Sequence, residues 1–230
     1  LFVEHVHYAQ RIMDDIIDLE LEKINQIIEK INNDPEPIDI KSTELYLWEK
    51  IKEKAIQGRR TGIGITAEGD MLAALGIKYG SDNAIKFCEE VHKLLAIETY
   101  RASVLLAKDR GAFPIYNWDK EIKNPFLQRL FIEDSDLKDA MEKHGRRNIA
   151  LLTVAPTGSV SICTQTTSGI EPVFLVTYKR RKKVNPNDVN VKISFVDELG
   201  DAWEEYKVFH HKFITWAEKQ GYSKEQLEGM

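Results

Sequence analysis

The feature that most constrains the fold is a short apolar run that stops at a proline. Residues 148–155 read Asn-Ile-Ala-Leu-Leu-Thr-Val-Ala, and Pro156 follows directly. A run of this length is typical of a strand buried on both faces, as in a parallel sheet covered by helices. Strands separated by long helices favour an α/β architecture, layered or barrel-like, over a helical bundle.

Apolar periodicity predicts the helices around this run. Apolar residues recur every three or four positions, which is the spacing of one helical face. The predicted helices are a first one over the stripe 13–31, ending near Asn33, and then 42–58, with Ser42 as its cap, 70–75, 81–108 and 198–219. Further strands are predicted over 61–66, 172–178 and 189–195.

The residues that follow the apolar run predict a strand-to-helix turn. Pro156 ends the strand, Thr157 is a candidate N-cap, and a helix beginning at Gly158 leaves its first backbone N–H groups unpaired. These amides, the partial positive charge of the helix end and nearby hydroxyls, including those of Ser159 and Ser161, suit a phosphate, which Gly158 lets approach the backbone. A plain turn with ordinary capping chemistry explains the same residues, so both interpretations stay open.

A second glycine motif, Gly62-x-Gly64-x-x-Ala67, matches the dinucleotide-binding fingerprint in its Gly/Ala form. The helix predicted after it is short, and no strand ending in an acidic residue follows about 20 positions later, as ribose recognition requires. We therefore favour a structural turn beside a packed strand over a cofactor site.

Composition excludes several classes of protein. With 37 acidic and 32 basic side chains, a net charge of −5 and 43% hydrophobic residues, the chain has enough apolar material for a core. Its apolar runs fall far short of the roughly 20 residues of a membrane-spanning helix. Two cysteines, Cys88 and Cys163, cannot form a disulfide scaffold or a four-cysteine metal site, which fits a cytoplasmic setting. We expect Cys163 to be a packing residue.

Three further groups of charged or histidine residues are explained by ordinary structural roles. The pairs Glu4-x-x-His7 and Glu89-x-x-His92 have the spacing of di-iron carboxylate bundles, but the predicted strands oppose such a bundle, so we expect no metal. The basic run 179–183 could neutralise phosphates, yet few aromatic residues accompany it, so a solvated strand end is favoured over a nucleic-acid surface. His210 and His211 are interpreted as a helix edge.

Several segments, taken in order, resemble the large catalytic subunit of ribonucleotide reductases. The segments are 13–18, 59–66 with 70–72, 100–103 with 111–114, 145–148, 155–161 and 168–174. The Ala-Pro-Thr-Gly wording of the turn is most similar to the adenosylcobalamin-dependent branch of that family. The resemblance covers most of residues 1–180 and is weaker beyond Lys183.

This resemblance implies that residues 1–230 form the C-terminal portion of a ten-stranded α/β barrel with long flanking helices. It implies that Pro156, Thr157, Gly158, Ser159 and Val160 hold the substrate's phosphates. The parent enzyme is then a ribonucleoside-diphosphate reductase, which replaces the ribose 2′-hydroxyl with hydrogen by radical chemistry. Its implied partners are the ribonucleotide substrate and the remainder of the parent chain, with a homodimer as a candidate assembly.

The chain departs from the family pattern at the catalytic thiols. The family carries its radical on a cysteine in an Asn-x-Cys-x-Glu-like motif, which this sequence lacks, and neither Cys88 nor Cys163 matches the expected positions. We therefore expect a fragment that has no catalytic residues of its own, with the catalytic loop preceding Leu1. The alternatives are a stand-alone nucleotide- or phosphate-binding module and, less favoured, an NAD-type oxidoreductase that uses Gly62 and Gly64.

Overall fold

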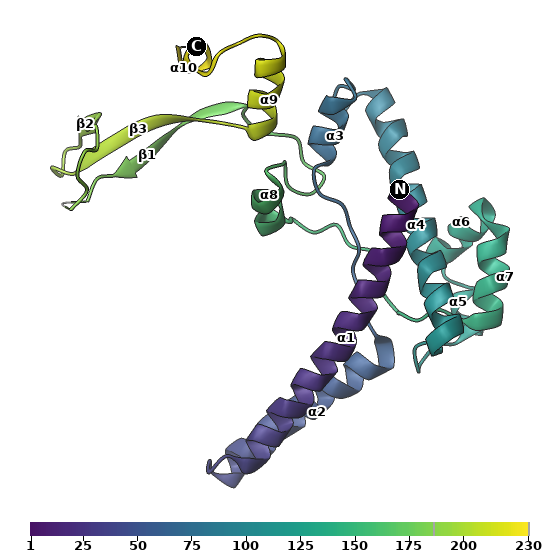
Figure 1. Cartoon of the computed structure of the whole chain (residues 1–230). Helices are drawn as coiled ribbons and strands as arrows, with labels where there is room; N and C mark the ends of the chain where they lie inside the picture. Colours follow the sequence, from purple (N-terminus) through teal and green to yellow (C-terminus); the bar gives the residue numbers. More distant parts are fainter. Residues whose placement is uncertain (186, 230) are drawn as a thin grey trace. The chain divides into compact units, whose positions relative to one another are not determined.

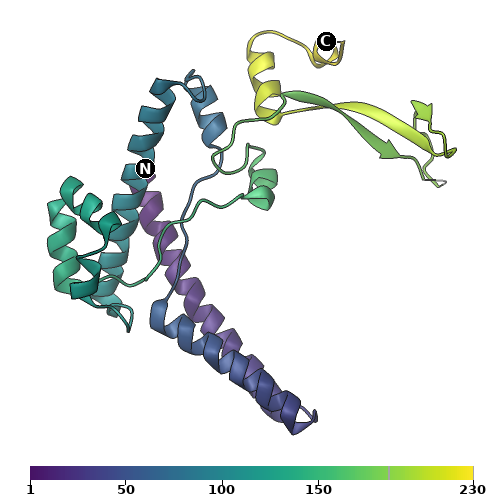
Figure 2. The same cartoon turned by 180° about the vertical axis from the view of Figure 1, so that it is seen from behind.

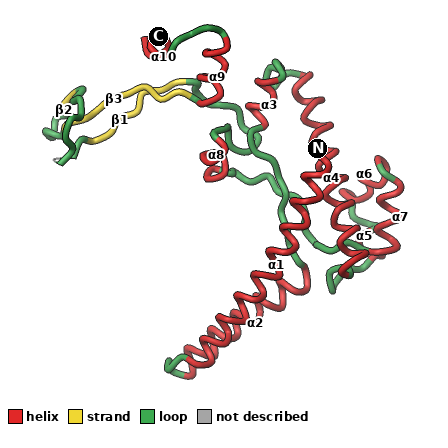
Figure 3. Tube along the Cα trace, viewed as in Figure 1, coloured by secondary structure: helices red, strands yellow, loops and turns green. Residues whose placement is uncertain are grey.

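A computed structural model describes residues 1–185 and 187–229, which include the apolar run at 148–155. The chain divides into two units. The first contains residues 1–64 and 85–154, and the second contains residues 65–84 and those from 155 onward. Figure 1 labels the elements along the chain, and Figure 3 separates helices, strands and loops.

Helices dominate the first unit. They are α1 (Phe2–Asn33), α2 (Ile38–Gly58), most of α4 (Asp82–Arg110), α5 (Trp118–Glu121), α6 (Pro125–Glu133) and α7 (Ser135–His144). Figures 1 and 2 both show α1 and α2 side by side. The short linker between them contains Pro35 and Pro37. The end of α1 confirms the prediction, whereas α2 begins before Ser42, whose hydroxyl donates to the backbone oxygen of Asp39 instead of capping the helix.

The apolar run pairs with the glycine-containing segment that follows α2. The Ile149 N–H donates to the Gly58 oxygen at 2.9 Å, and the Ile63 N–H donates to the Leu151 oxygen at 2.8 Å. Ile63 and Leu152 form a parallel bridge, as the run's composition predicts. Leu151 is 1% exposed. It completes a core formed with α4, α6 and α7 whose other members are Ala96, Tyr100, Val104, Leu127, Leu130, Phe131, Leu137 and Met141.

The second unit carries the remaining elements. They are α3 (Glu68–Ala74), α8 (Gly158–Thr164), β1 (Thr177–Lys183), β2 (Phe195–Val196), β3 (Ala202–Phe209), α9 (His211–Lys219) and α10 (Lys224–Gly229). The three strands form an antiparallel sheet in the order β1-β3-β2. Figure 3 shows β1 and β3 as a long hairpin.

Three predictions for the C-terminal third are wrong. The strand expected at 172–178 begins only at Thr177, and Phe174 within the expected range is 94% exposed. The strand expected at 189–195 is reduced to Phe195–Val196. The helix expected over 198–219 forms only in its second part, as a helix over 211–219. Ahead of it β3 forms, because its aromatic and β-branched residues suit a strand and its acidic residues lie opposite the basic β1.

The described residues establish an α/β chain but not a closed barrel. Besides the antiparallel sheet, they contain the single parallel pairing between 58–63 and 149–153. The ten-stranded form therefore stays a prediction. Within the described part of the chain, every helix is too short or too polar to cross a membrane.

Candidate functional site

The turn after the apolar run has the geometry of an N-terminal helix end. Thr157 adopts a left-handed conformation (φ 48°, ψ 29°), which is unfavourable for a β-branched residue, and α8 begins at Gly158. The Ser161 N–H donates to the Thr157 oxygen at 2.8 Å and is the first bond of the helical ladder. The N–H groups of residues 158–160 precede that bond and lie outside the ladder.

Thr157 occupies the predicted N-cap position, but its side chain does not cap the helix. Its Oγ1 instead accepts the N–H of Gly169 at 2.7 Å and lies 2.9 Å from the hydroxyl of Thr66. Thr66 in turn donates to the backbone oxygen of Thr167 at 3.2 Å. The turn is thus held by two segments of the second unit that are distant in sequence, and pattern reasoning gave no signal for this contact.

Space over the start of α8 is open. A Cβ added at Gly158 would meet no atom within 4 Å, so nothing in the unit fills the position that a ligand would approach. The side chain of Val160 is 51% exposed, whereas the Ser161 hydroxyl donates to the Gly158 oxygen at 2.8 Å. The hydroxyls of Thr157 and Ser161 are therefore engaged within the protein, whereas the amides of residues 158–160 lie outside the helical ladder.

The Gly62-x-Gly64 motif serves strand pairing. A Cβ at Gly64 would lie 2.4 Å from the backbone oxygen of Thr153, and one at Gly62 would lie 3.1 Å from the Thr153 methyl group. The partner strand fills the space that a dinucleotide's pyrophosphate would need. This packing supports the structural interpretation of the motif.

The first unit contains a buried polar cluster that sequence reasoning did not predict. Asp14 is fully buried on α1, and three arginines from separate segments reach its carboxylate. The distances to Asp14 are 2.8 Å from Arg59 Nε, 3.1 Å from Arg110 Nη1 and 3.3 Å from Arg147 Nε. Asn148 Nδ2 also donates to it at 2.9 Å. A patterned helix does not reveal that one of its acidic residues points inward.

The arginines keep Asp14 ionised. Burial by itself would raise its pKa, but hydrogen bonds from Arg59 and Asn148 and the charges of Arg59 and Arg147 outweigh burial and lower the pKa. Asp14, Asp15 and Asp18 bring their oxygens within 4.8 Å of one another, an arrangement that could hold a cation. Because Arg59, together with Arg110 and Arg147, already occupies the Asp14 carboxylate, the cluster is an ion-pair network that ties helices to strands.

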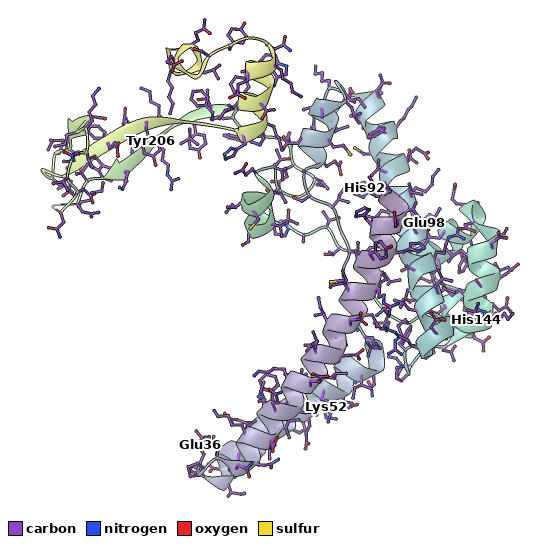
Figure 4. The ribbon with its side chains drawn as sticks, viewed as in Figure 1. Glu36, Lys52, His92, Glu98, His144 and Tyr206 are labelled. Atoms are coloured by element: carbon purple, nitrogen blue, oxygen red, sulfur yellow. The ribbon has the colours of Figure 1, made fainter. Side chains whose placement is uncertain are left out.

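The two histidine pairs lie on separate helices, Glu4 and His7 on α1 and Glu89 and His92 on α4. His7 Nε2 lies 2.9 Å from Glu98 Oε2, so α1 and α4 are joined by a histidine–carboxylate contact. Figure 4 labels Glu98 and His92 along α4. Cys163 is exposed on α8, which corrects its expected packing role, and Cys88 is partly buried on α4.

The basic run 179–183 lies entirely within the exposed strand β1, as predicted for a solvated strand end. Arg181 Nε lies 2.7 Å from Glu205, and Lys183 Nζ lies 2.6 Å from Asp201. His210 occupies the N-cap position of α9 without a capping hydrogen bond from its side chain, and His211 begins the helix, which confirms the helix-edge interpretation.

Comparison with known proteins places these features in context. The family model described as "Ribonucleotide reductase, barrel domain" matches residues 2–227. The vitamin B12-dependent ribonucleoside-diphosphate reductase of Mycobacterium tuberculosis (strain CDC 1551 / Oshkosh) is 31% identical over 142 residues, which is 62% of this chain and 18% of that protein. The corresponding enzyme of Thermoplasma acidophilum is 32% identical over 146 residues (62% and 16%).

A relative with a different printed name covers more of the chain. The ribonucleoside-diphosphate reductase subunit alpha of Chlamydia pneumoniae is 28% identical over 190 residues, which is 74% of this chain and 16% of that protein. The chain therefore spans less than a fifth of the length of these curated relatives.

Proposed function

Since this chain belongs to the ribonucleotide reductase barrel-domain family, we propose that it is a part of a ribonucleoside-diphosphate reductase and contributes the site for the substrate's phosphates. The proposed site is Pro156, Thr157, Gly158, Ser159 and Val160. The observation that carries this proposal is the set of three amides at residues 158–160, which precede the first helical hydrogen bond in an open turn.

The amides would bind the phosphate oxygens directly. Backbone N–H groups at a helix start carry partial positive charge, and charge-assisted hydrogen bonds to them are stronger than neutral ones. Gly158 matters because its missing side chain leaves the backbone accessible. The hydrogen bonds from Thr157 to Gly169 and Thr66 fix the amides before the substrate arrives, so less conformational entropy is lost on binding.

The intact enzyme would replace the ribose 2′-hydroxyl with hydrogen. Two relatives are named vitamin B12-dependent, which supports adenosylcobalamin as the radical source of the parent enzyme. We assign this chain phosphate binding and no catalytic step.

The finer architecture belongs to the same proposal. We place residues 1–230 in the C-terminal portion of one ten-stranded barrel domain, in a cytoplasmic enzyme that can form a homodimer and does not bind nucleic acid. The family match over residues 2–227 supports a single barrel domain. The mass of the parent enzyme in solution tests the dimer.

The phosphate site is tested by replacing Gly158 in the parent reductase. Gly158→Val should raise the KM for the ribonucleoside diphosphate at least tenfold, because the side chain projects into the open space over the amides. The fold should survive, since the added atoms meet nothing in the unit.

A matched control lies on the same helix. Ile162 is 79% exposed, so Ile162→Val changes the surface of α8 without touching the amides. Its KM should equal that of the wild type. An unchanged KM for Gly158→Val, with the protein folded, would remove the assignment.

A further inference from the structure

We propose that His210 is a positioning residue for the phosphate turn, acting through Asp70 and the loop 166–169. This inference rests on the proposed function of residues 156–160. All the groups involved belong to the second unit.

Asp70 and Thr167 hold each other reciprocally. The Thr167 N–H donates to Asp70 Oδ2 at 3.0 Å, and the Asp70 N–H donates to Thr167 Oγ1 at 3.4 Å. Asp70 lies in the first turn of α3, where the partial positive charge of the helix end favours a carboxylate. The loop 166–169 is therefore fastened to the start of α3.

The same loop fixes the phosphate turn. Its Thr167 oxygen accepts the Thr66 hydroxyl, and the N–H of Gly169 donates to Thr157 Oγ1. The hydroxyls of Thr66 and Thr157 complete the circuit at 2.9 Å. Because Thr157 lies in an unfavourable left-handed conformation, the position of the amides after it depends on these bonds.

His210 is directed at the one carboxylate in this network. Its Nε2 is buried and has no hydrogen-bond partner among the described residues, and it lies 3.7 Å from Asp70 Oδ2. The side chains of His210 and Asp70 are only 16% and 14% exposed. A buried nitrogen without a partner is unfavourable, and a small movement brings this pair to hydrogen-bond length of about 2.7–3.2 Å.

The backbone of His210 is anchored elsewhere. Its N–H donates to the Val176 oxygen at 3.0 Å, at the base of the hairpin formed by β1 and β3. His210 thereby connects the hairpin base to Asp70. When the His210–Asp70 contact closes, Asp70 Oδ2 is held from two sides, and the loop that carries Thr167 and Gly169 is held with it.

The test is a set of variants of the parent reductase, assayed with a ribonucleoside diphosphate. His210→Phe should raise KM about tenfold, as expected for the loss of a hydrogen bond to a charged group, and should leave kcat at saturating substrate unchanged. His210→Gln keeps an N–H donor and should restore most of the affinity. Exchange of the Gly169 amide proton should be faster in His210→Phe and near wild type in His210→Gln.

The neighbouring histidine provides the control. His211 is exposed at the start of α9, so His211→Phe should change neither KM nor the Gly169 exchange rate. If His210→Phe lowers the folded yield, Asp70→Asn removes the charged partner of His210 instead and should also raise KM.

The possible failures can be told apart. If Gly158→Val raises KM while the His210 and Asp70 variants leave it unchanged, the role of His210 is overturned and the phosphate site stands. If Gly158→Val also leaves KM unchanged, the phosphate site itself is wrong. A fall in kcat with constant KM in His210→Phe would likewise overturn a positioning role.

Discussion

At the scale of single residues, buried charge is the main departure from ordinary patterning. Asp14 is inaccessible to solvent, yet Arg59, Arg110 and Arg147 all reach it. A buried ion pair contributes little net stability relative to apolar packing, but removing one partner leaves an uncompensated buried charge. The cluster therefore contributes more to specifying which helices and strands pack together than to the net free energy of folding.

Asp14→Ala should lower the free energy of unfolding by about 3 kcal/mol, because Arg59, Arg147 and Asn148 would each lose a buried partner, while Arg59 keeps Asp18. Chemical denaturation measures this change. Asp15→Ala is the control: Asp15 is half exposed and pairs with Arg110 and, at 4.0 Å, with Arg11, so its loss should cost about 1 kcal/mol or less. Equal effects of the two variants would contradict the special role of Asp14.

The pH dependence of stability follows from the lowered pKa of Asp14. Its folded-state pKa lies below the ordinary aspartate value of 3.8, so the stabilisation is fully present above pH 3.8 and is lost as pH falls through the folded-state value. Denaturation midpoints measured from about pH 6 down to about pH 2 should fall less steeply in Asp14→Asn than in the wild type. Parallel curves would contradict the assignment.

At the scale of elements, glycine sets how closely strands approach. The segment 58–63 and the run 149–153 pair in parallel, and Gly64 sits where the backbone of Thr153 comes closest. The same residues that match a dinucleotide fingerprint are thus required by strand packing. The local motif is compatible with both a dinucleotide site and a strand pair, and only the position of the neighbouring strand distinguishes the two.

Gly64→Ala should destabilise the first unit by about 3 kcal/mol, the upper part of the overpacking range, because its Cβ would lie 2.4 Å from a backbone oxygen that cannot move easily. Gly62→Ala meets a methyl group at 3.1 Å and should cost less. Thermal unfolding of the two variants gives the comparison. A smaller effect at Gly64 than at Gly62 would count against this account of the strand pair.

At the scale of the whole molecule, the chain is a part of an enzyme family whose named members are more than five times longer than the matched region. Cys88 lies on α4 and Cys163 on α8, and the sequence around neither of them has the Asn-x-Cys-x-Glu-like pattern expected for the family's thiol chemistry. We propose that residues 156–160 bind phosphate, and we assign them no hydrogen transfer. Function at this scale belongs to the parent enzyme.

The isolated chain should accordingly show no reductase turnover with a ribonucleoside diphosphate, a dithiol reductant and adenosylcobalamin. The parent enzyme under the same conditions serves as the positive control, with deoxyribonucleotide formation as the measurement. Turnover by residues 1–230 alone would contradict the fragment interpretation.

Much of the candidate site was accessible to sequence reasoning because its signals are local. Pro156 ends an extended run, Thr157 occupies the N-cap position and Gly158 begins the helix. The free amides could therefore be predicted from the order of these residues in the sequence. The partners of Thr157 could not, since Thr66 and Gly169 are remote in sequence. For the same reason His210 carried no signal of its contact with Asp70.

Sequence alone established the long helices, the extended run and the turn after it, because helical periodicity and chain-breaking residues act within a few positions. The predicted burial of the run on both faces is wrong at its end, since Leu151 is buried but Val154 is 68% exposed. Tertiary structure decided the pairing of β1 with β3, where a helix was expected, and the burial of Asp14 among three arginines. Strand pairs and buried charges depend on residues that the chain brings together only on folding, so no local pattern specifies them.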